Sequence, residues 1–101
     1  MSLRIQKVSG ETAALTLSGR LDTTTAPELD AALEDVLPGA KELILDLRDL
    51  EYISSAGLRV LLKAQKSMHG ANGAMKLRNV PEDVLEVFDI TGFSDFLTIE
   101  S

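Results

Sequence analysis

The feature that most constrains the fold is a short apolar run that leads, through a polar segment, into a long apolar helix pattern. Residues 43–47 read Leu-Ile-Leu-Asp-Leu, and residues 58–68 repeat apolar side chains at helical spacing. An unbroken apolar run is typical of a strand in a parallel sheet that helices cover on both faces. Four small residues, 54–57, precede the helix pattern, and a serine there can cap a first helical turn. This stretch therefore predicts a strand, a polar loop and a helix that begins at Ser54 or Ser55.

The N-terminal part of the chain predicts a β-hairpin followed by a helix. Apolar residues alternate with polar or small ones over residues 13–17 and, less regularly, over residues 3–8. A polar segment then leads to Thr25, which together with Glu28 has the spacing of a capping box. We expect the helix that starts there to end at Pro38-Gly39, because neither residue continues a helix well.

The C-terminal part predicts a strand at residues 75–77, a third helix after Pro81, and a last short strand around Phe96, Leu97 and Ile99. The order β-β-α-β-α-β-α-β predicts an α/β fold with a mixed sheet of four to five strands and three main helices. Its central strands are expected to be parallel and joined by right-handed crossovers. The loops after the second, third and fourth strands should then meet at one edge of the sheet.

Length and composition limit the kind of protein. A chain of 101 residues predicts one domain over residues 1–101, and 45% hydrophobic with 26% charged residues is ordinary for a globular protein. The formal net charge of −6 argues against nucleic-acid binding and favours a partner with a basic or mixed face. No apolar stretch approaches the roughly 18 residues of a membrane span, and the N-terminus does not resemble a signal peptide. We expect a cytoplasmic monomer without membrane insertion.

The sequence shows no catalytic constellation. There is no cysteine, and the one histidine, His69, falls near the end of the second predicted helix, far from Ser55. Both serines therefore lack an evident general base. No glycine-rich phosphate loop with its lysine occurs. We predict that the protein is not an enzyme and has neither a metal site nor a cofactor.

Three segments resemble the STAS domain, the module shared by bacterial anti-sigma factor antagonists and the cytoplasmic tails of sulfate transporters. The family pattern is a strand ending in Asp-Leu, a loop with an aromatic residue, then Asp-Ser-Ser-Gly-Leu and an apolar helix. Residues 46–47, 52–53 and 54–58 lie on these positions. Residues 19–22 match a Gly-x-Leu-Asp that enters the first helix, and residues 88–96 resemble a closing Leu-Thr-Gly-Leu…Phe element.

The resemblance implies a phosphorylated serine at Ser55, with two departures from the family pattern. Ser54 replaces the acidic residue that precedes the phosphorylated serine, and Ala56 replaces the second serine. Loss of the adjacent carboxylate leaves Ser54 as an alternative acceptor. From residue chemistry alone, the favoured interpretation of either serine is a simple N-cap, because serine is among the commonest capping residues.

The resemblance also implies a function as an anti-sigma factor antagonist. In this family the unmodified domain binds an anti-sigma factor, which is also a serine kinase, and so frees the sigma factor. Phosphorylation breaks the complex, and a separate serine phosphatase restores it. The implied partner-binding residues are Asp22, Thr23, Thr24, Ser54, Ser55, Gly57 and Arg59.

Some of these assignments have simpler alternatives. Asp22 is also a good turn-forming residue, and Arg59 also suits a solvated helix face. The first half of the second helix is apolar on almost all sides, which fits either burial against the sheet or partner contact at its start. Two other functions stay open: an accessory subunit that docks on a transporter ATPase, and, from a different class, a small nucleotide-binding or hydrolytic protein that uses Ser55.

Overall fold

The computed structural model describes residues 3–95 and 97–100. Phe96, which we included in the last predicted strand, lies outside the described residues. Along the chain the elements are β1 (Leu3–Val8), β2 (Thr12–Leu21), α1 (Ala26–Val36), β3 (Glu42–Ile53), α2 (Ser55–Gly70), β4 (Ala74–Arg78), α3 (Glu82–Thr91), the 3₁₀ turn η1 (Phe93–Asp95) and β5 (Ile99–Glu100).

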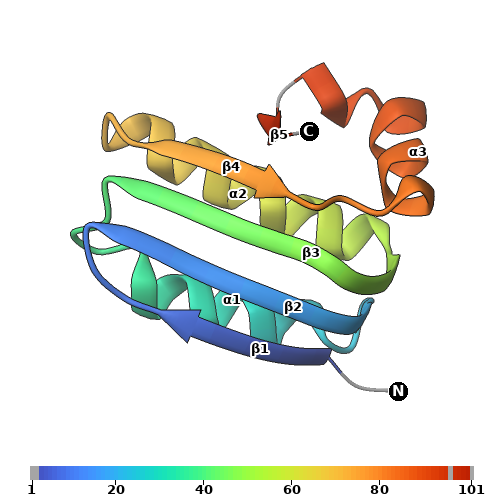
Figure 1. The fold of residues 1–101 in the computed structure, drawn as a ribbon, viewed down its shortest axis with the longest axis horizontal. Coiled ribbons are helices and arrows are strands. Elements are labelled where there is room, and N and C mark those ends of the chain that lie inside the picture. The colour runs from blue at the N-terminus through green and yellow to red at the C-terminus, as the bar shows by residue number, and fades with distance from the viewer. Residues whose placement is uncertain (1–2, 96, 101) are drawn as a thin grey trace.

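The strands form one five-stranded mixed sheet in the order β1-β2-β3-β4-β5. The β1–β2 pair is an antiparallel hairpin, and the other three neighbouring pairs are parallel. Figure 1 shows this sheet with α1 and α2 behind it and α3 at one end. The predicted α/β fold, with parallel central strands and three main helices, is confirmed.

Helices α1 and α2 cover only one face of the sheet (Figure 1). In β3, Leu43 and Leu45 are fully buried, whereas Ile44 and Asp46, which alternate with them, are partly exposed. The prediction that this strand is covered on both faces is therefore wrong. The strands follow each other in chain order, so right-handed crossovers place both helices on the same face.

Strand β3 is longer than its apolar run predicts, because it continues through the segment that we expected to be a loop. The pairing of β3 with β2 shifts at two places in this segment. Each shift adds one residue to β3 and returns the next apolar side chain to the core, as β-bulges do. As a result Leu47, Leu50 and Ile53 are all buried at intervals of three residues. The bulges explain why the two-residue alternation ends at Leu47.

Strand β4 ends well before β3 does. Arg78, its last residue, pairs with Asp46 in the middle of β3. The following Asn79 donates its side-chain amide to both carboxylate oxygens of Asp46 at 3.2 Å. The expectation that the loop after β4 joins the other two loops at one edge is therefore wrong. Helix α3 lies beside the remaining part of β3 instead, with Val84 and Phe88 buried.

Candidate functional site

The site lies where β2 and β3 end side by side. Leu21 and Ile53 pair at the ends of these strands, and the backbone N–H of Ser54 donates to the carbonyl oxygen of Leu21 at 2.9 Å. The loop that enters α1 and the first turn of α2 are thereby adjacent, as expected for loops at the carboxyl ends of neighbouring parallel strands.

Ser54 is the N-cap of α2. Its backbone is extended (φ −98°, ψ 174°), and its hydroxyl oxygen accepts a hydrogen bond from the backbone N–H of Gly57 at 3.3 Å. This geometry satisfies one of the N–H groups that a helix start leaves without a partner. The side chain is half-buried, and its hydroxyl is engaged in the cap.

Ser55 is the first residue of α2 and is exposed. Within the described part of the chain its hydroxyl makes no hydrogen bond. It lies at the positive end of a helix of 16 residues, where N–H groups and the helix dipole favour a negative charge. Of the two adjacent serines, Ser54 therefore caps the helix, whereas Ser55 presents an accessible hydroxyl that forms no hydrogen bond among the described residues.

Asp22 organises the loop that precedes α1. Its Oδ1 atom accepts hydrogen bonds from the backbone N–H and hydroxyl of Thr24, at 3.0 and 2.7 Å, and from the backbone N–H of Thr25 at 3.1 Å. The Thr24 hydroxyl is the main cause that lowers the pKa of Asp22, and the backbone bonds from Thr25 and Thr24 act in the same direction. The turn-forming interpretation of this residue is confirmed.

Thr25 holds this loop to the end of β2. It is 2% exposed, and its hydroxyl donates to the carbonyl oxygen of Arg20 and accepts from the backbone N–H of Asp22, both at 2.8 Å. The predicted capping box with Glu28 is wrong, because the side chain of Thr25 makes no cap hydrogen bond. The hydroxyl is turned back toward the strand, where buried backbone groups need partners.

Gly57 allows α2 to start close to the sheet. A Cβ atom at this position would lie 2.6 Å from Cγ of Leu21 and 3.1 Å from Cγ1 of Ile53. The first distance is shorter than Cβ contacts in proteins and the second is unusually tight, so only glycine fits without movement of the core. Gly57 is itself buried, beneath the exposed first turn that carries Ser55.

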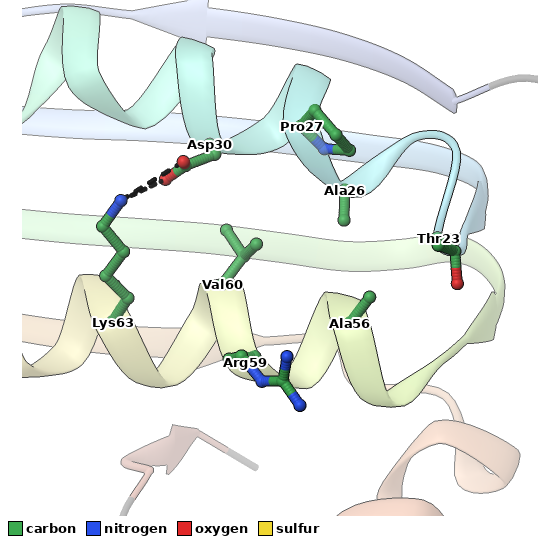
Figure 2. Close-up of a pocket in the computed structure, with 8 residues that line it drawn as sticks. All are labelled: Thr23, Ala26, Pro27, Asp30, Ala56, Arg59, Val60 and Lys63. Carbon is green, nitrogen blue, oxygen red and sulfur yellow. Dashed lines mark hydrogen bonds and ion pairs between the residues drawn. The ribbon is translucent and has the colours of Figure 1, made fainter.

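A groove between α1 and α2 begins at the site. Figure 2 shows Ala26 and Val60 in its floor and the ion pair between Lys63 and Asp30 (3.0 Å) across it. Two predicted contact residues, Thr23 and Arg59, lie along this groove. Its lining consists of Thr23, Ala26, Pro27, Asp30, Ala56, Arg59, Val60 and Lys63.

One pair near the site was not predicted. The guanidinium of Arg20 lies over the ring of Tyr52, 4.3 Å from its centroid, a cation–π contact between the ends of β2 and β3. The two residues pair across the strands only because β3 bulges just before Tyr52. No local pattern in the sequence signals that register.

The described residues contain no group of three or more His, Cys, Asp or Glu side chains placed to hold a metal ion. His69 is exposed in the last turn of α2, at the other end of the helix from Ser55. None of the helices in the described part of the chain has the length and hydrophobicity needed to span a bilayer.

A mixed sheet with two crossover helices on one face defines a small two-layer α/β domain, in which a capped helix start presents an exposed serine. The family model described as "Mlab, STAS domain" matches residues 6–99. The chain belongs to the STAS domain family, as its sequence motifs predict.

The sequence is similar to those of named relatives over most of its length. It is 39% identical over 94 residues to the putative anti-sigma factor antagonist BtrV of Bordetella bronchiseptica, covering 92% of this chain and 80% of the relative. It is 32% identical over 85 residues to the anti-sigma-B factor antagonist of Bacillus subtilis, covering 84% and 78%.

The fold is similar to that of the Bacillus anti-sigma factor antagonist SpoIIAA at 19% identity. The TM-score is 0.75 for the unphosphorylated form, with 98% of this chain and 87% of that chain covered. It is 0.74 for the phosphorylated form, with 98% and 91% covered.

Proposed function

We propose that this chain is an anti-sigma factor antagonist that binds an anti-sigma factor with serine kinase activity and so releases a sigma factor. Phosphorylation of Ser55 switches the binding off, and a serine phosphatase resets it. The observation that carries the proposal is the division between the two serines: Ser54 caps α2, and Ser55 presents an exposed hydroxyl. Relatives that are 30–39% identical carry the antagonist name, which supports the same role here.

A phosphate on Ser55 is compatible with the fold. It adds about −1.5 to −2 charges at pH 7, and the positive end of α2 stabilises negative charge. The fold is about equally similar to the unphosphorylated and phosphorylated forms of SpoIIAA. The cost therefore falls on the interface, where a dianion must lose its water against a surface shaped for a hydroxyl. A loss of about 3 kcal/mol weakens binding roughly a hundredfold.

In this proposal the protein acts by binding and catalyses no reaction. Among the described residues the Ser55 hydroxyl forms no hydrogen bond to a histidine or carboxylate that could act as its base, and the kinase supplies the ATP. Buried Gly57 lets the helix start lie close to the sheet, and the loop that carries Asp22, Thr23 and Thr24 follows the adjacent end of β2. The proposed partner-binding set is Asp22, Thr23, Thr24, Ser54, Ser55, Gly57 and Arg59.

The phosphorylation test compares wild type with Ser55→Ala and Ser54→Ala in extracts of the host supplied with ATP. Intact mass and peptide mapping over residues 52–59 should show one phosphate on Ser55 in wild type and in Ser54→Ala, and none in Ser55→Ala. A phosphate on Ser54 would keep the function and overturn the assignment of the residue.

The binding test uses the kinase that phosphorylates the protein, purified from those extracts. Ser55→Asp should bind it roughly a hundredfold more weakly than wild type, because the carboxylate brings charge to the same place. Equal affinity would overturn the switch. Absence of phosphate under every growth condition, with copurification of a transporter ATPase, would favour the accessory-subunit function instead. Nucleotide affinity of the isolated chain would favour the nucleotide-binding alternative.

A further inference from the structure

Helix α2 has a charge opposite to that of the whole chain. Its 16 residues include Arg59, Lys63 and Lys66 and no Asp or Glu, whereas the chain contains 10 Lys and Arg against 16 Asp and Glu. A face of this helix therefore presents positive charge on a molecule whose formal net charge is −6. A partner bound to this face interacts mainly with the positive charges of α2, because the more distant charges of the chain, beyond about 10 Å, are screened at 0.1 M salt.

The positive charges of α2 lie in line with the proposed phosphorylation site. Ser55, Arg59, Leu62, Lys66 and His69 are spaced four, three, four and three residues apart, which places them on one helix face. We refer to these five residues as the α2 stripe. All are exposed except Leu62, which is half-buried and lines two shallow hollows along α2, one beside Arg59 and one beside His69.

The two cations on either side of Leu62 have no ion-pair partner within the described part of the chain. Lys63, at the border of the stripe, pairs with Asp30 of α1 at 3.0 Å. Arg59 and Lys66 form no ion pair among the described residues. Figure 2 shows the Arg59 guanidinium pointing away from the Asp30–Lys63 pair. Two cations thus flank an accessible apolar side chain, Leu62.

We propose that the α2 stripe docks an acidic amphipathic segment of the partner protein, with carboxylates against Arg59 and Lys66 and an apolar side chain beside Leu62. This inference rests on the proposed function and deepens it by assigning the chemistry of the partner's face. The proposed partner face is acidic, whereas the net charge of the whole chain led us to expect a basic or mixed one.

A narrow protein segment fits this surface better than a flat anionic membrane. Helix α1 borders the stripe across the groove, and it carries Glu28, Asp30, Glu34 and Asp35 with no Lys or Arg. Asp30 and Asp35 are ion-paired, but a flat anionic surface placed on α2 would also approach Glu28 and Glu34, which form no ion pair among the described residues, and be repelled. A single acidic segment lying along α2 meets the cations and avoids α1.

The stripe also gives phosphorylation a direct electrostatic effect. Arg59 is one helical turn after Ser55, so a phosphate on Ser55 lies next to the first cation of the stripe. The added charge of about −1.5 to −2 offsets most of the positive charge that attracts the partner's carboxylates. Phosphate and partner therefore compete for the same cation.

The test measures the affinity of the purified kinase that phosphorylates Ser55 for wild type, Lys66→Glu and Lys41→Glu. Both variants make the same charge change at an exposed lysine, but Lys41 is not part of the α2 stripe. It lies just before β3, at the opposite end of α2 from Ser55. At low salt Lys66→Glu should raise Kd about tenfold and Lys41→Glu less than about twofold. The difference should shrink toward 1 M salt, where the screening length is about 3 Å.

The outcomes separate this inference from the proposed function. If wild type binds the kinase and the two variants bind with equal affinity, the stripe is not the docking surface, while the proposed function stands. If wild type does not bind the kinase at all, both the inference and the proposed function fail.

A second experiment tests binding to a membrane. Wild type, Lys66→Glu and Lys41→Glu are mixed with phosphatidylcholine vesicles containing phosphatidylserine. Binding by wild type that Lys66→Glu alone abolishes would overturn the inference in favour of a membrane.

Discussion

At the residue scale, Ser54 and Ser55 have different physical environments although they are neighbours with the same side chain. Ser54→Ala removes the oxygen that accepts from the Gly57 N–H, which should lower the free energy of unfolding by about 1 kcal/mol. Ser55→Ala removes an exposed hydroxyl and should change it by less than about 0.5 kcal/mol. Urea unfolding of the two variants measures the difference. Equal losses would show that Ser54 is not the effective cap.

The Asp22 carboxylate provides a second test at the residue scale. The fold lowers its pKa below the ordinary value of 3.8, chiefly through the Thr24 hydroxyl. The ionised carboxylate is therefore favoured in the folded state. Its contribution to stability is present above the unfolded pKa and is lost as the pH falls through the lower, folded pKa.

Thr24→Val should raise the Asp22 pKa toward 3.8, because the hydroxyl donor is lost while the two backbone donors remain. An NMR titration of the side-chain carboxyl carbons follows this change. Thr23→Val is the matched control, since Thr23 is exposed and makes no hydrogen bond to Asp22 in the described structure. An unchanged pKa in Thr24→Val would assign the effect to the backbone.

At the element scale, the position of α2 depends on its close approach to β2 and β3. Gly57→Ala gains helix propensity of up to about 1 kcal/mol, but its Cβ would lie 2.6 Å from the buried Leu21 side chain. Overpacking of this kind costs about 1–3 kcal/mol, so we expect a net loss of about 1 kcal/mol.

Gly70 supplies the control for that prediction within the same helix. A Cβ at Gly70 meets nothing within 4 Å, so Gly70→Ala should be neutral or stabilise by up to about 0.5 kcal/mol. Thermal or urea unfolding of both variants measures the contrast. A gain in stability for both would mean that Leu21 and Ile53 can move aside, and that the close approach does not require glycine.

At the scale of the whole molecule, the buried side chains of the sheet and all three helices form one core. Phe88 of α3 is among the largest fully buried side chains, whereas Ile90 on the same helix is 84% exposed. Phe88→Ala should lower the free energy of unfolding by about 3–5 kcal/mol, and Ile90→Ala by less than about 0.5 kcal/mol.

Because the core is shared, the loss in Phe88→Ala should appear as a shift of one cooperative transition. Far-ultraviolet circular dichroism and Tyr52 fluorescence should then report the same midpoint in urea. Two separate transitions would show that α3 unfolds independently of the sheet, and that its packing beside β3 does not contribute to global stability.

Local patterns in the sequence were sufficient to predict much of the fold and the helix start at the centre of the candidate site. The hairpin, the central strand and the helix start at Ser54 and Ser55 follow from alternation, apolar runs and capping residues, all of which act over a few neighbouring positions. The capping box at Thr25 failed because its hydroxyl bonds the Arg20 carbonyl oxygen, a competitor that local spacing does not reveal.

The sequence by itself determined the order of elements, the family motifs and the placement of a serine pair at a helix start, because each depends on short-range chemistry. Only the tertiary structure decided that the helices cover one face, that β3 extends through two bulges to Ile53, and that Asn79 meets Asp46 away from the site. Only the structure, too, showed that Lys63 of α2 is paired with Asp30, whereas Arg59 and Lys66 form no ion pair among the described residues. Strand register and surface charge depend on which distant segments lie side by side, and pairing across the sheet sets that arrangement.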